Sequence, residues 1–242
     1  MTQSSIDAAD PYPNWGRYGD LRPDAIEAIR ERTPIAFVPW GALEWHSLHA
    51  PIGLDSTKAE NLCLAIAERT GGVVLPPIPL GVNTIKPYKG FPHSIDISAG
   101  VATSVAEEIC IQLADEKFKV VILFTGHYPP EQIDALQEGA DRAGKSTNGS
   151  RFEVWADNQL LGEAFKGDHA GATETSFQML FDRESVNLEA LPDRALSLDG
   201  DGIMGEDPRE ASVERGKQQL KVVLENAIPK VEALLEQAEN TK

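Results

Sequence analysis

The sequence has little positive charge and little cysteine. Its 242 residues include 22 lysines and arginines against 38 aspartates and glutamates, which gives a formal net charge of −16. This negative charge repels nucleic-acid phosphates and anionic membrane surfaces, so we expect neither as a partner. The two cysteines, Cys63 and Cys110, fall in apolar helical patterns, which favours buried free thiols over a disulfide.

Long apolar runs are also absent. No segment reaches the roughly 18 apolar residues that a membrane-spanning helix needs, and the first residues lack the basic and apolar stretches of a secretory signal. We therefore expect a cytoplasmic protein.

Short apolar runs alternate with helical patterns along the chain. Strands are predicted over 35–40, 73–75, 119–124 and 152–155, and helices over 24–32, 57–69, 99–116, 131–142, 173–181 and 211–236, the last interrupted at Pro229. Residues 76–97 have no clear period and are predicted as a loop. This alternation indicates an α/β fold with a mainly parallel sheet in three α/β/α layers. We expect a single domain over residues 1–242, with an irregular N-terminal segment over 1–20.

Polar residues follow two of the predicted strands, where open α/β sheets bind their ligands. Glu44, His46 and Asp55 lie in WGALEWHSLHAPIGLDS after the first strand, and His127 follows KVVILF. In extended backbone, residues 44 and 46 point to the same face. Carboxylate and imidazole ligands suit zinc, manganese or iron, and Asp55 could bridge two ions through its two oxygens. Any one of these residues alone would more often be an ordinary hydrogen-bonded loop residue, so the prediction depends on the cluster.

Three ordered motifs resemble those of the creatininase (creatinine amidohydrolase) family. GALEWHSLHAPIGLD resembles the first metal motif, FTGHY the second, and HAGATETS, from His169 to Ser176, the third. GIMGEDPREASVERG resembles the loop before the last helix of the family, so the resemblance extends over nearly the whole chain. It implies a metal-dependent hydrolase in which a metal-activated water cleaves a C–N bond of a small cyclic amide or formamide.

The resemblance also implies roles for individual residues. It places metal ligands at Glu44, His46, Asp55 and His127, with Asp55 as the bridging carboxylate. Glu174 matches the glutamate of the third motif, a further metal ligand or catalytic group; otherwise it is a carboxylate favoured at a helix start. His169 matches a histidine assigned to proton transfer. Two divalent ions (zinc, manganese or iron), a small-molecule substrate and a homo-oligomer, a hexamer in the family, complete the expectation.

Two loops depart from the family pattern. Pro129 stands where creatininase has a metal-binding glutamate, which argues against creatinine as the substrate. His93 and Ser94 follow Phe-Pro where many relatives have Gly-Thr. The residues expected to contact substrate are Tyr128, Trp45, Trp155, His93, Lys86 and Tyr88. For Lys86, Tyr88 and His93, a solvated loop is an equal alternative.

Two other functions stay open at this point. Relatives open a carbon ring with similar chemistry, so the substrate could be a keto-inositol or a related keto-sugar. The missing glutamate could instead mark a non-catalytic metal-binding scaffold. The segment GADRAGKS, Gly139 to Ser146, matches the P-loop pattern, but a helix rather than a strand is predicted before it, so we reject nucleotide binding and interpret Gly144 as a helix stop.

Overall fold

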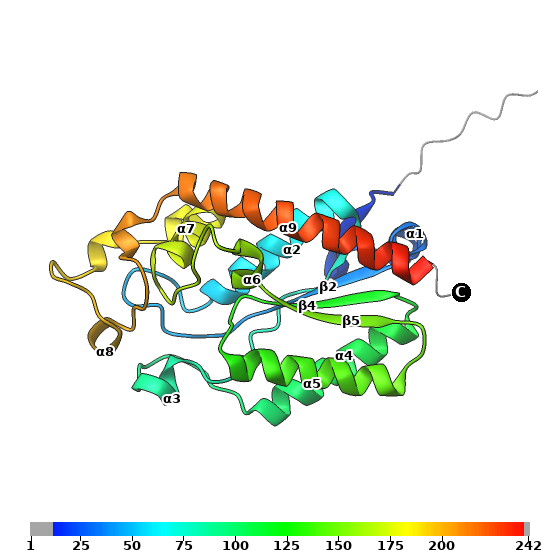
Figure 1. Ribbon diagram of the computed structural model, residues 1–242, viewed down its shortest axis with the longest axis horizontal. Helices are drawn as coiled ribbons and strands as arrows, with labels where there is room; N and C mark the ends of the chain where they lie inside the picture. The colour runs from blue at the N-terminus through cyan, green and yellow to red at the C-terminus, as the bar shows by residue number, and fades with distance from the viewer. Residues whose placement is uncertain (1–11, 240–242) are drawn as a thin grey trace, which may run out of the picture.

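The computed structural model describes residues 12–239, in which five parallel strands form one sheet in the order β1-β3-β2-β4-β5 (Figure 1). The strands are β1 (Trp15–Arg17), β2 (Ile35–Trp40), β3 (Gly72–Val74), β4 (Val120–Thr125) and β5 (Arg151–Ala156). The central strand β2 pairs with β4 along its whole length and with β3 on its other side. The predicted α/β class with a parallel sheet is confirmed.

Helices cover both faces of this sheet. One face carries α2 (Leu54–Thr70), α6 (Asp157–Leu161), α7 (Ala172–Phe181) and α9 (Val213–Glu239), and the other carries α1 (Pro23–Arg32), α4 (Ala99–Asp115) and α5 (Pro130–Ser146). Two short helices, α3 (Ile85–Lys89) and α8 (Leu198–Asp201), lie in the loops beyond one end of the sheet (Figure 1). Single 3-10 turns are η1 (Tyr18–Asp20), η2 (Arg183–Ser185), η3 (Leu188–Ala190) and η4 (Pro208–Glu210). The three-layer arrangement follows, because each face of the sheet buries an apolar helix surface.

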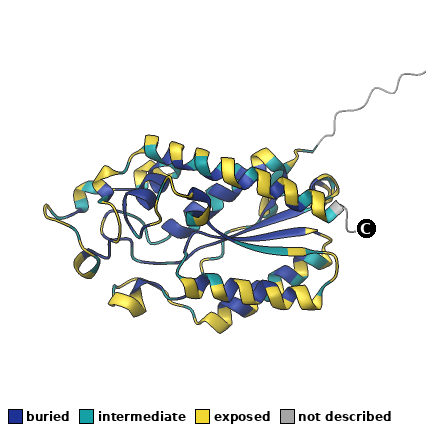
Figure 2. Cartoon of the chain, viewed as in Figure 1, coloured by how far each residue is buried: buried dark blue, intermediate teal, exposed yellow. Residues whose placement is uncertain are grey.

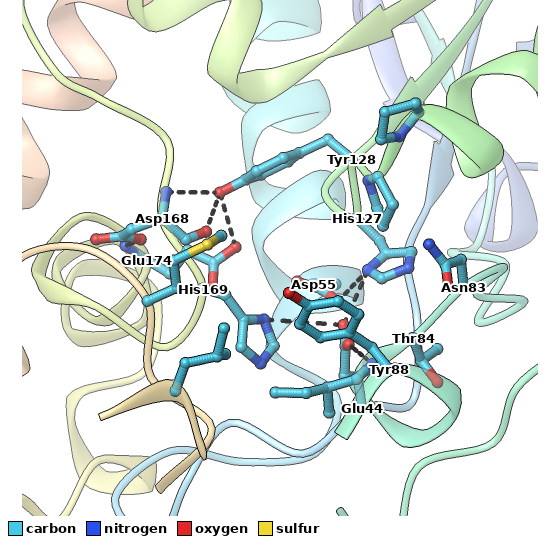
Figure 3. A pocket seen from close by; sticks show the side chains of 15 residues that line it. Glu44, Asp55, Asn83, Thr84, Tyr88, His127, Tyr128, Asp168, His169 and Glu174 are labelled. Carbon is cyan, nitrogen blue, oxygen red and sulfur yellow. Dashed lines mark hydrogen bonds and ion pairs between the residues drawn. The ribbon is translucent and has the colours of Figure 1, made fainter. Parts of the chain in front are cut away.

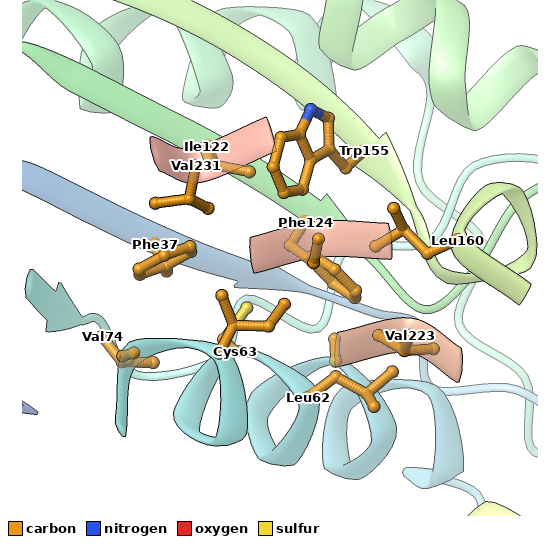
Figure 4. Packing of buried hydrophobic residues seen from close by; sticks show 14 of the residues in the cluster. Phe37, Leu62, Cys63, Val74, Ile122, Phe124, Trp155, Leu160, Val223 and Val231 are labelled. Atoms are coloured by element: carbon orange, nitrogen blue, oxygen red, sulfur yellow. The ribbon is translucent and has the colours of Figure 1, made fainter. Parts of the chain in front are cut away.

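Side chains of the strands alternate between two hydrophobic clusters. In β2, Ile35 and Phe37 pack toward α2 and α9, whereas Ala36 and Val38 pack toward the helices of the opposite face (Figure 4). All six residues of β2 are buried, which explains why the strand reads as a continuous apolar run. Figure 2 shows the consequence: the central strands β2, β3 and β4 are buried throughout, the edge strands β1 and β5 are partly exposed, and the long helices expose their outer sides.

Several boundaries differ from the sequence prediction. The segment 1–20 was expected to be irregular, but β1 lies within it and pairs with β3, while residues 1–11 are outside the described range. The expected interruption of the last helix is wrong, because α9 runs through Pro229. Pro229 is exposed, so water can satisfy the carbonyl that a proline leaves without a donor. Loop 76–97 contains the unpredicted helix α3.

The P-loop pattern lies inside α5, which confirms that it does not bind phosphate as a P-loop. Gly144 was expected to end this helix, but α5 continues to Ser146. Cys63 and Cys110 are buried free thiols, as predicted. Within residues 12–239, no helix is long and apolar enough to cross a membrane.

Candidate active site

The predicted ligands converge beyond the carboxyl ends of β2 and β4. Glu44 and His46 lie in the loop after β2, His127 follows β4, and Glu174 lies in the first turn of α7. Asp55 lies in the first turn of α2, not in the loop that was expected to precede that helix. A helix N-terminus favours a carboxylate there. Figure 3 shows the carboxylates of Glu44 and Asp55 directed toward the ring of His127.

A glycine allows the loop after β2 to pass close to α2. A Cβ atom at Gly41 would lie 2.4 Å from the backbone nitrogen of Ser56, a distance that no other residue could accept. The loop is fixed further along by the backbone hydrogen bond from Glu44 to Ile52, 2.9 Å long. The glycine therefore brings Glu44 and Asp55, which are distant along the loop, to one point.

Two groups of three candidate ligands share Asp55. The Glu44 group consists of Glu44, Asp55 and His127, and the His46 group consists of His46, Asp55 and Glu174; the ligand atoms of each group lie within 4.8 Å of one another. In the Glu44 group, Nδ1 of His127 lies 2.9 Å from Oε2 of Glu44 and 3.4 Å from Oδ2 of Asp55. In the His46 group, Nε2 of His46 lies 3.4 Å from both Oδ1 of Asp55 and Oε2 of Glu174. The two oxygens of Asp55 thus face different groups.

Backbone carbonyls orient both histidines. Nδ1 of His46 lies 3.0 Å from the carbonyl oxygen of Glu44, and Nε2 of His127 lies 3.0 Å from that of Val82. A carbonyl can only accept, so each of these ring nitrogens carries the proton. The other nitrogen of each ring faces the carboxylates. Metal-binding histidines are commonly held in this way by a hydrogen bond on their outer nitrogen.

The buried donor atoms fit a divalent cation. Oε2 of Glu44, Nε2 of His46 and Oδ2 of Asp55 are buried, and among the described residues they form ion-pair contacts with one another's groups but no hydrogen bond of good geometry. Leaving such atoms unsatisfied is costly, and three of them point into one small region. Nitrogen and carboxylate oxygen are ligands that zinc, manganese and iron accept. The chemistry of these donors therefore matches the expected metal ions.

Charges within the cluster shift its pKa values strongly. Burial disfavours a charged imidazole, but the carboxylates around His127, Glu44 foremost, outweigh burial and raise its pKa from 6.5 to about 10. The pKa of His46 is likewise raised well above its usual value, since Asp55 and Glu174 outweigh burial. The charged side chains of His46, His127 and Lys58 in turn hold the pKa of Asp55 well below its usual range despite burial. Without metal, both histidines carry charge at neutral pH, and a metal ion would replace their protons.

His169 differs from these two histidines. Its Nε2 lies 2.9 Å from the carbonyl oxygen of Trp45, and its Nδ1 lies 4.0 Å from Oε2 of Glu44. Burial, together with the nearby charge of His46, lowers the pKa of His169. The ring is therefore neutral at pH 7 and leaves Nδ1 free to accept a proton.

Sequence reasoning missed Lys58, which is completely buried beneath the site. Its Nζ lies 2.6 Å from Oε1 of Glu174, 3.1 Å from Oδ2 of Asp157 and 3.9 Å from Oδ1 of Asp55. Burial opposes its charge, but these carboxylates raise the pKa of Lys58 above its usual value. A signal was present in the sequence, because Lys58 precedes the apolar Leu62 by one helical turn and so belongs to the buried face of α2.

Asp168 was also missed, and it orders the start of α7. Its carboxylate accepts the backbone N–H groups of Thr173, at 2.7 Å, and of Glu174, at 3.1 Å. The hydroxyl of Tyr128 lies 2.5 Å from the carbonyl oxygen of Asp168 and 3.2 Å from Oε1 of Glu174. These contacts fix the helix end that carries Glu174.

A cavity of about 330 Å³ opens over the cluster. Its wall includes Glu44, Asp55, His127, His169 and Glu174, together with Asn83, Thr84, Ile85, Leu198, Met204 and the prolines 129 and 130. Of the six residues expected to contact substrate, Tyr88 and Tyr128 line this cavity. The hydroxyl oxygen of Thr84 is buried and has no hydrogen-bond partner among the described residues.

The structure does not bring the other four expected residues to the cavity wall. Trp155 packs in the hydrophobic cluster between β5 and α9 (Figure 4). Side chains alternate between the two faces of the sheet along β5, and Trp155 lies on the face that α9 covers. Trp45 donates its indole N–H to the carbonyl of Asp201 at 3.2 Å and stacks on Phe91 and His93. Lys86 is exposed and donates to the carbonyl of Ser94 at 3.2 Å. Three of the four thus support the loops around the mouth of the cavity, and Trp155 supports the core.

Comparisons with known proteins identify the family of this chain. A sequence model of the creatininase family, described as creatinine amidohydrolase, matches residues 20–231. A creatinine amidohydrolase of Pseudomonas putida is 26% identical over 180 residues, which are 66% of this chain and 68% of that protein. A crystal structure of creatininase superposes with a TM-score of 0.78 at 22% identity, covering 90% of this chain and 97% of that one.

Metal-containing forms of creatininase share the fold as well. A structure of the Mn form has a TM-score of 0.76 at 21% identity and covers 90% of this chain and 98% of that one. A mutant of the Zn-Zn type has a TM-score of 0.75 at 21% identity and covers 92% and 98%.

The structure is a three-layer α/β fold whose paired ligand groups are suited to bind metal. The chain belongs to the creatininase family, and it is an amidohydrolase of that family.

Proposed function

We propose that the chain uses two divalent ions to cleave a C–N bond of a small cyclic amide or formamide. The observation that carries this proposal is the pair of ligand groups that meet at Asp55 on the wall of the cavity. The Glu44 group would hold one ion and the His46 group the other. When bound, such ions activate a water molecule and polarise the carbonyl under attack. Zinc, manganese and iron all suit these ligands.

His169 would carry the proton. Its Nε2 is held by the carbonyl of Trp45, so only Nδ1, on the cavity side, is free to exchange a proton. Because its pKa is lowered, the ring starts neutral and can accept a proton from the attacking water. The same nitrogen can then donate that proton to the leaving nitrogen of the amide. A scaffold without activity would not need this arrangement, so we do not favour the non-catalytic alternative.

Glu174 fits a ligand role better than a role as proton donor. Its carboxylate accepts from Lys58 and from the backbone N–H of Ala170, at 2.6 and 2.8 Å. Burial would raise its pKa, but Lys58 and His46 outweigh burial and lower the pKa to about 2. Such a group stays ionised at any pH at which the protein would work.

The cavity suits a small, largely uncharged ring. Apolar side chains such as Ile85, Leu198 and Met204 form one part of its wall. Pro129 replaces a ligand glutamate of creatininase, which argues against creatinine itself. Ring opening of a keto-inositol stays a second candidate, because the loop that carries His93 and Ser94 departs from the family pattern.

Three further expectations accompany this proposal. We infer a single domain, because both hydrophobic clusters pack against the same sheet. A hexameric assembly and a cytoplasmic location remain predictions, the first from family resemblance and the second from composition.

Metal content per chain tests the proposal. The protein would be purified without chelator, equilibrated with zinc, manganese or iron, and measured by elemental mass spectrometry. We expect about two ions per chain, the stoichiometry of a bridged two-metal site, and a marked loss in Asp55→Asn because both groups share this residue. Retention of no metal under any condition would contradict the proposal. A screen of cyclic amides, formamides and keto-inositols on the loaded protein would then separate the candidate substrates.

A further inference from the structure

One glutamine lies among the small and apolar residues that α5 buries. Gln132 is completely buried in the first turn of this helix. The other buried residues of α5 are Ala135, Leu136, Gly139, Ala140 and Ala143. Burying a polar amide is costly unless its atoms find hydrogen-bond partners. Packing of the helix alone therefore does not explain why a glutamine stands at this position.

Gln132 uses one end of its amide and leaves the other without a partner. Its Oε1 accepts the backbone N–H of Val82 at 2.7 Å. Its Nε2 is buried and has no hydrogen-bond partner among the described residues. Because the N–H of Val82 can only donate, the carbonyl end of the amide has to face it. The bond to Val82 is thus kept although the other end of the side chain loses its hydrogen bonds to water.

Val82 is held on its other side by His127. Nε2 of His127 donates to the carbonyl oxygen of Val82 at 3.0 Å. His127 precedes the start of α5 and Gln132 lies just inside it. These two side chains therefore bind the two backbone groups of a single residue, and a shift of Val82 would move the carbonyl that orients the imidazole.

The loop that contains Val82 also contacts Glu44. The backbone N–H of Ile85 donates to Oε1 of Glu44. Between Val82 and Ile85, Asn83 is in the left-handed region with a φ of 55°, and its side-chain amide donates to Glu131 in the first turn of α5 at 2.9 Å. Residues 82–85 therefore lie between the first turn of α5 and two of the three candidate ligands of the Glu44 group (Figure 3).

We propose that Gln132 is a positioning residue of the metal centre. By fixing Val82 it fixes residues 82–85, whose backbone groups orient His127 and Glu44 toward Asp55. The inference rests on the proposed metal-binding function, and it adds a residue that acts through the backbone rather than on the metal ion. Loss of a group that orients a ligand typically lowers metal affinity by about 10–100-fold. Since Gln132 acts through one further hydrogen bond, we expect an effect of about tenfold.

Binding of Co²⁺ to the chelator-treated full chain tests this inference, because its visible absorption reports both affinity and ligand geometry. Gln132→Met keeps a side chain of similar length and removes the acceptor for Val82, so Co²⁺ should bind about tenfold more weakly and with an altered spectrum. Gln178→Met serves as the control. Gln178 is also a buried glutamine with one unpartnered amide atom, and it donates at 2.7 Å to Ser185, beyond the end of α7. This variant should bind Co²⁺ as the wild-type chain does.

A second measurement follows His127 directly. The chain has five histidines, so selective ¹⁵N labelling allows NMR to follow the Nε2–H of His127, the proton that Val82 accepts. In the metal-free chain, Gln132→Met should speed exchange of this proton with water by about tenfold or more, because the loop opens more often once Val82 is released. Gln178→Met should leave the exchange rate unchanged.

Each outcome decides the role of Gln132. Unchanged Co²⁺ affinity in Gln132→Met, or equal losses in Gln132→Met and Gln178→Met, would overturn the inference and leave the proposed function standing. Weaker binding without faster exchange would show that Gln132 does not act through Val82, which also overturns it. If the wild-type chain binds no Co²⁺, the proposed function and the inference are both wrong.

A shorter side chain gives a second variant in case Gln132→Met fails to fold. Gln132→Asn retains a polar amide but withdraws its oxygen from Val82. It should therefore weaken Co²⁺ binding and speed exchange of the His127 proton in the same way. Wild-type behaviour of Gln132→Asn in both measurements would contradict the proposed role.

Discussion

Gly126 lies so close to Asp55 that a Cβ atom on it would be 2.3 Å from the carbonyl oxygen of Asp55. This contact joins the end of β4 to the first turn of α2. It brings His127, the next residue, within 3.4 Å of the carboxylate of Asp55. The glycine of the motif FTGHY is therefore required by packing.

Gly126→Ala should weaken metal binding and destabilise the fold. The methyl group would push β4 away from α2, and overpacking of this kind typically costs about 1–3 kcal/mol. Urea unfolding and metal content would measure the two effects. Gly144→Ala is the matched control: this glycine is exposed in α5 and its nearest neighbour would be 3.9 Å away. It should stabilise the protein by about 0.5–1 kcal/mol. Equal metal content in both variants would show that the Gly126 contact does not position the site.

The stability of the metal-free protein should fall as pH rises from about 7.5 to 10. The folded state holds the proton of His127 up to a pKa of about 10, whereas the unfolded chain releases it near 6.5. The stability that this proton provides is complete below pH 6.5 and lost as pH passes through the folded pKa, at up to about 1.4 kcal/mol per pH unit. Asp157 and Asp168, whose pKa values burial raises to about 7, titrate below this window.

Urea unfolding in the presence of a chelator would measure this slope. The metal-loaded protein should lack it, because a bound ion replaces the protons of His46 and His127. A metal-free protein whose stability is flat between pH 7.5 and 10 would contradict the assigned charge of the two histidines.

His169→Ala should lower kcat by about 100-fold or more without loss of metal, which is the usual cost of removing a general acid–base group. The assay would use the substrate found by the screen, and metal content would be measured on the same sample. Undiminished turnover would show that another group transfers the proton. A parallel loss of metal would indicate that His169 is a ligand, since it also lies near Glu44 and His46.

The two thiols should resist alkylation in the native state. Burial raises the pKa of Cys110 to about 12 and raises that of Cys63 well above its usual value. Thiolate is the reactive form, so labelling at pH 7.5 should be slow until the chain unfolds. Mass spectrometry after timed exposure to iodoacetamide would measure both rates. Rapid labelling of Cys63 would show that α2 opens away from the sheet.

The local pattern of the sequence was enough to predict the central strands and long helices. Ile35 to Trp40 and the run to Phe124 are continuous apolar segments, and strands buried on both faces have to read that way. The strand β1 was missed because its residues, Trp15–Arg17, carry no such pattern. It exists because the backbone of β3 offers it a partner.

Candidate ligands could be named from the sequence because their spacing and order match the motifs of a known family. Trp155 was misplaced because a position at the end of a strand does not reveal which face its side chain takes. Lys58 was overlooked because a lysine is normally exposed, and nothing local shows that three carboxylates surround it.

The sequence by itself determined the parallel α/β fold and the set of residues that can bind metal, because apolar periodicity and ligand spacing are local properties. Only the tertiary structure decided which residues meet: that each oxygen of Asp55 faces a different histidine, and that Lys58 contacts Glu174. Those relationships join residues far apart in the chain, and they depend on close packing at positions such as Gly126. Local sequence cannot specify them, because the distance between two side chains is set by the elements packed between them.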